Sequence, residues 1–235
     1  MIFKAAFRVP ARVVCVLSLA ISGLAPYAQQ NPNAAIIEGI NASVHAREDH
    51  LLGYTVTEHY AVFRKGDETK PGAEMVLKTT YQRASGKNFS VISSSGSLLL
   101  RKLLDEVLAS EKKMTQPANR ATVLITPANY EMTVKGPAAI DGRNCMAVIL
   151  KPRRESPYLF NGTLWVDAQN QAIVQLEGVA SKSASMFAGP AQISRQYATI
   201  GGFPMATHAR AVSNSALLGQ TVIKIDYSGY QIQAQ

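Results

Sequence analysis

The stretch FNGTLWVDAQNQAIVQLEG, residues 160–178, decides the fold. An apolar run ends at Asp167, a polar segment follows, and a second apolar run starts at Ile173. This pattern predicts a strand, a tight turn and a returning strand. The two faces of the first strand are expected to carry Phe160, Leu164 and Val166, and Leu159, Thr163 and Trp165, respectively. Since a sheet with one wet face alternates more cleanly, both faces of this hairpin should be partly covered.

Short apolar runs bounded by turn residues continue on either side of this hairpin. Asp141-Gly142, Asn161-Gly162 and Gly201-Gly202 are interpreted as turn dipeptides. Because no helix separates consecutive strands after Arg120, the pattern favours an antiparallel meander over a βαβ fold. The predicted strands are 53–63, 74–83, 88–94, 121–126, 129–135, 143–151, 158–166, 171–180, 190–200, 203–213 and 219–231.

Two segments have helical spacing. The first follows Asn31-Pro32, a cap and a proline at the first helical position, and should end near residues 47–50. The second follows Ser97, which is expected to cap it, and ends near Lys113. Its apolar stripe contains Leu100, Leu104, Val107 and Leu108, widened by Leu99 and Leu103.

The element count predicts a mainly β fold with two helices, of the α+β class. About ten or eleven strands are too many for a flat sheet, because long twisted sheets curl. We therefore expect a strongly curved antiparallel sheet, or half-open β-barrel, with the helices over its concave face. A hydrophobic hollow fits lipid carriage, whereas a flat sandwich, or a hollow lined by charged and hydroxyl groups, would end the lipid-carrier hypothesis.

The first 28 residues resemble a leader. Lys4, Arg8 and Arg12 precede an apolar run at residues 13–21, and Ala28 follows, which is the layout of a secretory signal peptide. We expect residues 29–235 to form one domain. The leader holds three of the 24 Lys+Arg residues and none of the 16 Asp+Glu residues, so the mature net charge is +5 instead of +8. This mild, scattered charge does not indicate a nucleic-acid groove.

Reactive chemistry is sparse in the sequence. Export would leave Cys145 as the single cysteine, which excludes a disulfide framework and a Cys-rich metal site. No Gly-x-Ser-x-Gly elbow occurs, and His45 and His50 are spaced five apart, which is wrong for a helical zinc pair. We therefore expect no catalytic residue, no metal and no cofactor. His59 and His208 are interpreted as surface or satisfied polar residues. The many tyrosines fit ordinary strand propensity better than the alternative, a ligand-lining role.

A family resemblance adds to this picture. GTLWVDAQNQAIVQLEG (residues 162–178) resembles the Gly-x-x-Trp-Val-Asp hairpin of exported proteins similar to the LolA family, within the LolA/LolB-like superfamily. CMAVILKPRRE (residues 145–155) resembles the strand ending in Lys-Pro that precedes that hairpin. The order of one helix, three strands, one helix and many strands also agrees. The resemblance implies a half-open barrel with helices across its mouth and a hydrophobic cavity that binds acyl chains in the periplasm.

The resulting functional hypothesis is an exported bacterial protein, periplasmic or secreted, that binds acyl chains or lipidated protein without catalysis. Its expected partners are lipid or lipidated protein, with transient membrane contact and no nucleic acid, and the protein is expected to be a monomer. The candidate ligand-binding residues are Leu100, Leu103, Leu104, Val107, Leu108 and Trp165.

Three alternatives stay open. The first is a β-sheet protein-interaction or sensor scaffold whose concave face is filled by the helices. The second is a secreted hydrolase with an unrecognised site. The third is an integral outer-membrane barrel, which the helix at residues 97–113 disfavours because it interrupts the strands.

Overall fold

The computed structural model describes residues 1, 31–183, 189–216 and 218–235. The predicted signal peptide, residues 1–28, lies outside the described residues except for Met1. The fold is therefore that of residues 31–235, which form one compact unit. No helix in the described ranges is both long and apolar enough to cross a membrane.

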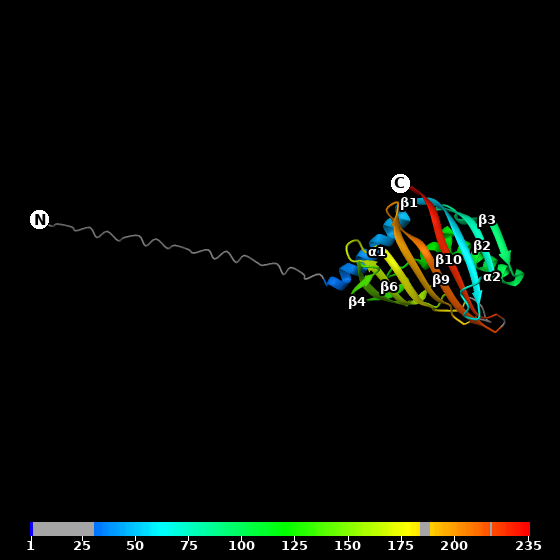
Figure 1. Cartoon of the computed structure of the whole chain (residues 1–235). Helices are drawn as coiled ribbons and strands as arrows, with labels where there is room; N and C mark the ends of the chain where they lie inside the picture. Colours follow the sequence, from blue (N-terminus) through cyan, green and yellow to red (C-terminus); the bar gives the residue numbers. More distant parts are fainter. Residues whose placement is uncertain (2–30, 184–188, 217) are drawn as a thin grey trace. The chain divides into compact units, whose positions relative to one another are not determined.

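Ten strands form one antiparallel sheet (Figure 1). Most follow the predicted ranges, and the last extends three residues further than expected. Their bounds are β1 (Leu51–Arg64), β2 (Ala73–Gln82), β3 (Gly86–Gly96), β4 (Tyr130–Ile140), β5 (Arg143–Pro152), β6 (Phe160–Asp167), β7 (Ile173–Ala180), β8 (Gln192–Ile200), β9 (Phe203–Ser215) and β10 (Gly219–Ala234).

The strand order is β3-β2-β1-β10-β9-β8-β7-β6-β5-β4. Neighbours along the chain pair, except β3 and β4, and the first and last strands of the chain pair inside the sheet, with Tyr60 opposite Ile225. The sheet is open, with β3 and β4 at its two ends. The predicted fold class, a mainly β half-barrel of about ten strands, is confirmed.

Two long helices cover separate parts of one face. α1 (Pro32–His50) begins as predicted, because Asn31 Oδ1 accepts a hydrogen bond from the Asn33 amide at 3.1 Å. α2 (Leu98–Thr115) follows Ser97, which occupies the cap position without a side-chain capping bond. Figure 1 shows α1 near β4 and β6, and α2 near β2 and β3.

The strand predicted at residues 121–126 is wrong. The chain there forms a short helix α3 (Pro117–Arg120) and a 3₁₀ turn η1 (Ala121–Val123). Side chains occupy carbonyls that a sheet ladder would need: Asn129 Nδ2 donates to Ala121 O at 2.9 Å and to Leu124 O at 2.8 Å. These bonds hold the segment as a turn, which hydrophobic pattern alone does not reveal.

Each long helix has its own core against the sheet. Leu100, Leu104 and Leu108 of α2 pack with residues of β1, β2, β9 and β10. Ile40 and Val44 of α1 pack with residues of β4–β7 and with Leu159. Burying a leucine fully contributes about 1.5–3 kcal/mol, so each helix is fixed mainly by its apolar stripe. A third cluster, around Tyr54, Tyr81 and Met205, lies at one end of β1.

The 160–178 hairpin forms as predicted, but two details differ. Asn161 and Gly162 lie inside β6 and do not form a turn. Gly162 is paired with Gly178, and a Cβ at Gly162 would lie 2.0 Å from Glu177 O, so the glycine permits close strand approach. Leu159 precedes the strand and is buried on the same side as Leu164, because strand alternation does not extend to it.

Asp167 forms the turn of this hairpin. Its Oδ1 accepts hydrogen bonds from the amides of Gln169 at 2.8 Å and Asn170 at 3.2 Å, and Arg143 Nε donates to Oδ2 at 2.6 Å. Burial raises the pKa of Asp167, but these donors outweigh burial and lower it below its ordinary value. The Trp-Val-Asp motif therefore has a structural role in the turn.

Candidate functional site

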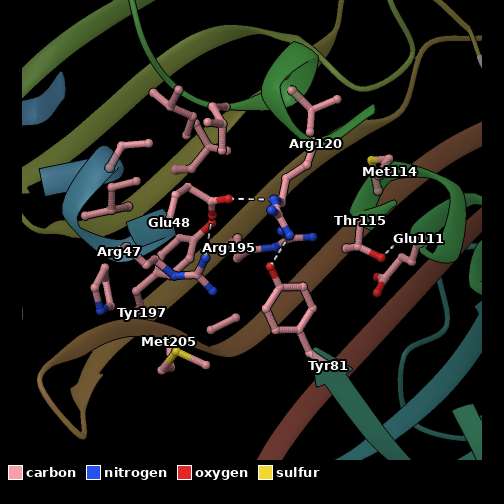
Figure 2. Close-up of a pocket in the computed structure, with 18 of the residues that line it drawn as sticks. Arg47, Glu48, Tyr81, Glu111, Met114, Thr115, Arg120, Arg195, Tyr197 and Met205 are labelled. Carbon is pink, nitrogen blue, oxygen red and sulfur yellow. Dashed lines mark hydrogen bonds and ion pairs between the residues drawn. The ribbon is translucent and has the colours of Figure 1, made fainter. Parts of the chain in front are cut away.

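A cavity of about 280 Å³ lies between α1, α2, the 120s turn and the sheet. Figure 2 shows side chains from several of these elements converging on it. Strands from both halves of the sheet contribute residues, among them Tyr81 of β2, Leu176 of β7 and Arg195 of β8. Because both long helices also line the cavity, α1 and α2 cover the same face of the sheet.

One wall of the cavity is apolar. It is continuous with the α1 core, since Val44 and Leu176 belong to both. This apolar wall consists of Val44, Val123, Leu124, Ile125, Phe160, Ile173 and Leu176. The turn at residues 121–126, which was predicted as a strand, supplies three of these residues. The apolar wall therefore depends on this segment folding as a turn.

The remaining lining is polar, and most of its charged side chains pair with one another. Arg120 Nε lies 2.7 Å from Glu48 Oε2, and Arg47 Nη1 lies 3.2 Å from Glu48 Oε1. Arg120 Nη1 also donates to Tyr81 Oη at 2.7 Å and to Arg83 O at 2.8 Å (Figure 2 draws the Glu48 and Tyr81 contacts). Arg120 therefore ties the turn after α2 to α1 and to β2.

A second ionic cluster lies deeper. Lys87 Nζ on β3 is 3.2 Å from Glu58 Oε1 and 2.7 Å from Glu111 Oε2, and Tyr60 Oη donates to Glu58 Oε2 at 2.7 Å. Burial lowers the pKa of Lys87, but Glu111, Tyr54 and Glu58 raise it well above its ordinary value. Conversely, burial raises the pKa of Glu111, and Lys87 and Arg195 bring it below its ordinary value. Both groups are therefore charged at neutral pH.

Tyrosines fill much of the remaining lining. Tyr54 stacks on Tyr81 with ring centroids 5.1 Å apart, and Tyr230 contacts Tyr54 edge-on at 5.6 Å. Tyr230 Oη donates to Ala206 O at 2.8 Å. The lining tyrosines are Tyr54, Tyr81, Tyr158, Tyr197, Tyr227 and Tyr230. Interpreting the tyrosines only as strand formers therefore missed their shared position in the cavity.

The hollow thus has a mixed lining, which corrects the expectation of a uniformly hydrophobic one. The physical reason is that strand alternation predicts which residues share a face, but not which strands are neighbours. Here β1, β2, β8 and β10 bring their polar inward positions together beneath the gap between the helices.

The six candidate ligand-binding residues lie elsewhere, and their role stays a prediction. Leu100, Leu104 and Leu108 are buried in the α2 core, with Leu103 and Val107 packed against it. Trp165 is half-buried and alternates with Leu164 and Val166, which places it on the opposite face of β6. The cavity lining, taken from the described residues, includes none of the six.

Titratable groups outside the cavity are dispersed. His59 Nε2 lies 3.1 Å from Glu74 Oε1, and His208 Nδ1 lies 2.7 Å from Asp226 Oδ1, both in exposed positions on strands. Cys145 is buried, and burial raises the pKa of its thiol. Within the described ranges, no three His, Cys, Asp or Glu side chains gather as a metal ion would require.

No family model and no curated protein matches the chain. Among solved structures, it is similar to a DUF1329 family protein from Desulfovibrio piger, with 13% identity, a TM-score of 0.44, and coverage of 86% of this chain and 94% of that one. A putative outer membrane lipoprotein-sorting protein domain from Vibrio parahaemolyticus has 10% identity, a TM-score of 0.40 and coverage of 86% and 94%. A LolA superfamily protein from Nitrosomonas europaea has 16% identity, a TM-score of 0.34 and coverage of 86% and 93%.

A LolA superfamily protein is thus among the solved structures to which this chain is similar, and the 160–178 hairpin resembles the same superfamily. These likenesses concern the fold, and at such identities and TM-scores they carry neither a ligand nor an activity to this chain.

Proposed function

We propose that this chain is a non-catalytic, exported binding protein that holds an acyl chain, of a lipid or of a lipidated protein, in the cavity between α1, α2 and the sheet. The observation that supports the proposal is the apolar wall, which joins the α1 core to the open cavity. The proposed location, the bacterial periplasm or the secreted fraction, rests on the signal-peptide pattern of residues 1–28.

The energetics favour one chain. The volume of about 280 Å³ is at the lower end of small-ligand sites, which span about 300–1,000 Å³. Burial of each CH₂ contributes about 0.8 kcal/mol, so roughly eight methylenes along the apolar wall contribute about 6 kcal/mol before the cost of ordering the chain. That gain needs no reactive group.

The ion pairs on the polar side are compatible with an acyl ligand. Glu48 is shared by Arg47 and Arg120, and Lys87 is held between Glu58 and Glu111. Since these charges satisfy one another, they do not require water at the apolar wall. The tyrosine rings between them add apolar surface with a hydroxyl at one end.

A fluorescent fatty acid and a wall substitution test the proposal. We expect dodecanol and dodecanoate to displace the probe from the full chain, and Ile173→Glu, which places a charge in the apolar wall, to weaken binding about tenfold or more. Val179→Glu is the matched control, because Val179 is exposed on the same strand. Native mass spectrometry shows whether the protein carries lipid when it is purified from a membrane-bearing host. Protein that is lipid-free in this measurement and never binds the probe would rule the proposal out.

One observation favours the scaffold alternative. Val91 and Ile92 on the edge strand β3, with Leu98 and Leu99 at the start of α2, are exposed large apolar residues. Edge strands with apolar side chains can add an extended peptide. Under this alternative the cavity stays empty of lipid, so the same probe separates the two functions.

A further inference from the structure

Arg195 differs from the other cations around the cavity. It projects from β8 into the lining, and its Nε atom is buried without a hydrogen-bond partner in the described part of the chain. Within those same ranges, no carboxylate oxygen forms an ion pair with its guanidinium at 4.0 Å or less. A guanidinium placed inward with an unused donor is costly unless something else binds it.

The charge balance around the cavity points the same way. Four cationic side chains line it, Arg47, Lys87, Arg120 and Arg195. Glu48 and Glu111 also line it, and Glu58 lies behind Lys87. Four cations against three carboxylates leave one positive charge. Arg47 and Arg120 share Glu48, and Lys87 lies between Glu58 and Glu111, so Arg195 is the one of these four cations without an ion pair in the described residues, and Glu111 acts on it only at longer range.

Hydroxyl donors accompany this charge. Tyr197 and Tyr227 line the same cavity and both act on Arg195 electrostatically, and the Arg195 guanidinium also donates a hydrogen bond to the Tyr197 side chain, which leaves Nε as its unused donor. Burial, followed by Glu111, raises the pKa of Tyr227 above its ordinary value, so this phenol keeps its proton at neutral pH. A planar guanidinium with a phenol donor beside it matches the oxygens of a carboxylate or phosphate.

We propose that the cavity selects an anionic amphiphile, whose carboxylate or phosphate head binds Arg195 while its apolar chain lies along the apolar wall. This inference rests on the proposed function and narrows its ligand class. The head group supplies the partner that the Arg195 Nε donor lacks, and the chain supplies the burial energy. Arg195 is then the specificity-determining residue, and the ion pairs at Glu48 and Lys87 keep the other cations from competing for the head group.

Four probes test this by isothermal titration calorimetry at neutral pH: dodecanoate, dodecyl phosphate, dodecanol and inorganic phosphate. We expect each anionic amphiphile to bind the full chain about tenfold or more tightly than dodecanol, which is the scale of one charge-assisted hydrogen bond. Arg195→Met should remove that advantage, so that dodecanoate and dodecanol bind the variant with similar affinity. Arg210→Met is the control, because Arg210 is paired with Ser194 across the ladder and so lies on the other face of the sheet.

The outcomes separate the two proposals. Equal affinity for dodecanoate and dodecanol, or a preference that survives Arg195→Met, overturns the role of Arg195 and leaves acyl binding intact. Failure of all three chain-bearing probes to bind overturns the proposed function itself. If inorganic phosphate binds as tightly as dodecyl phosphate, the site binds free anions, and the proposal of an amphiphilic ligand is overturned.

Folding of the variant is checked by circular dichroism and by urea unfolding. If Arg195→Met does not fold, Arg195→Lys carries the test, since it keeps the charge but loses the planar fork. The preference for dodecanoate should then fall without vanishing, and an unchanged preference contradicts the proposal.

Discussion

Lys87 Nζ lies between two carboxylates, 3.2 Å from Glu58 Oε1 and 2.7 Å from Glu111 Oε2. The three side chains are almost fully enclosed, with side-chain exposures of 11%, 0% and 10% for Lys87, Glu58 and Glu111. Enclosed charges stabilise a fold only while they compensate one another. At the scale of single residues, this cluster joins α2 to β1 and β3.

Lys87→Met is expected to lower the free energy of unfolding by about 3–5 kcal/mol, because it leaves two enclosed carboxylates without their cation. Urea unfolding measures the change. Lys112→Met, at an exposed position of α2, is the control and should change stability by less than about 0.5 kcal/mol. A loss below about 1 kcal/mol for Lys87→Met would contradict this account of the cluster.

The same cluster predicts an acid response. The pKa of Glu111 lies below its ordinary value of 4.5: burial raises it, but Lys87 and Arg195 outweigh burial. A carboxyl with a depressed folded-state pKa contributes stability that is complete above its unfolded pKa and is lost as pH falls through the folded value.

The stability difference between the wild type and Glu111→Gln should therefore shrink as the pH falls from about 6 to about 3. Urea titrations at several pH values measure it, with Glu106→Gln, on an exposed face of α2, as the reference. A difference that stays constant with pH is the result that opposes the prediction.

Gly162 provides a steric prediction. Its Cβ would lie 2.0 Å from Glu177 O, a backbone atom that cannot rotate away. Gly162→Ala should therefore force β6 and β7 apart and cost about 1–3 kcal/mol in thermal or urea unfolding. Gly189→Ala is the control, since its Cβ would meet only Asn214 O at 4.0 Å. Equal stability of the two variants would show that the strands adjust freely.

At the scale of elements, α2 follows its sequence pattern closely. The predicted stripe is the buried one, with Leu100, Leu104 and Leu108 almost fully covered, while Leu99 is 46% exposed. Helical spacing predicts which residues share a face. It does not say whether that face meets the sheet or a ligand, and here the leucines meet β1, β2, β9 and β10.

Leu104→Ala should therefore cost about 2–5 kcal/mol of stability, because it opens a cavity in a tightly packed core. Leu99→Ala should cost less than about 1 kcal/mol, since the side chain is half in water. Folded Leu104→Ala protein should keep its affinity for a fluorescent fatty acid. Loss of that affinity with unchanged stability would instead show that the leucines of α2 line the ligand site.

At the scale of the whole molecule, two helix cores share one sheet. The α1 core and the α2 core have no buried residue in common, and the cavity with its mixed lining lies between them. The ten strands are nevertheless continuous from β3 to β4. Substitutions in the two cores should then act independently on stability while the sheet unfolds as one unit.

Ile40→Ala combined with Leu104→Ala tests this arrangement. Both side chains are fully buried, each in a different core. Their stability losses should add to within about 0.5 kcal/mol, and unfolding should remain a single transition by circular dichroism and tryptophan fluorescence. Two separate transitions, or a coupling energy above about 1 kcal/mol, would contradict this division of the core.

The sequence by itself determined the class of fold, the position of both long helices and nearly every strand. These features depend on local periodicity and turn chemistry, which are set by residues close together in the chain. The turn at residues 121–126 escaped it because carbonyls there bind side chains from outside the segment, namely Asn129 close by in the chain and Arg154 further along.

Only the tertiary structure decided the cavity. Its polar side takes Tyr81 and Lys87 from β2 and β3, Arg195 from β8 and Tyr227 from β10, with Glu48 and Glu111 from the two helices. The pairing of β1 with β10 places these distant segments side by side. Side-chain charge is a property of the residue, but its partner depends on which strands are neighbours. The free Nε donor of Arg195 is for this reason a result of packing, and no local pattern in the sequence could contain it.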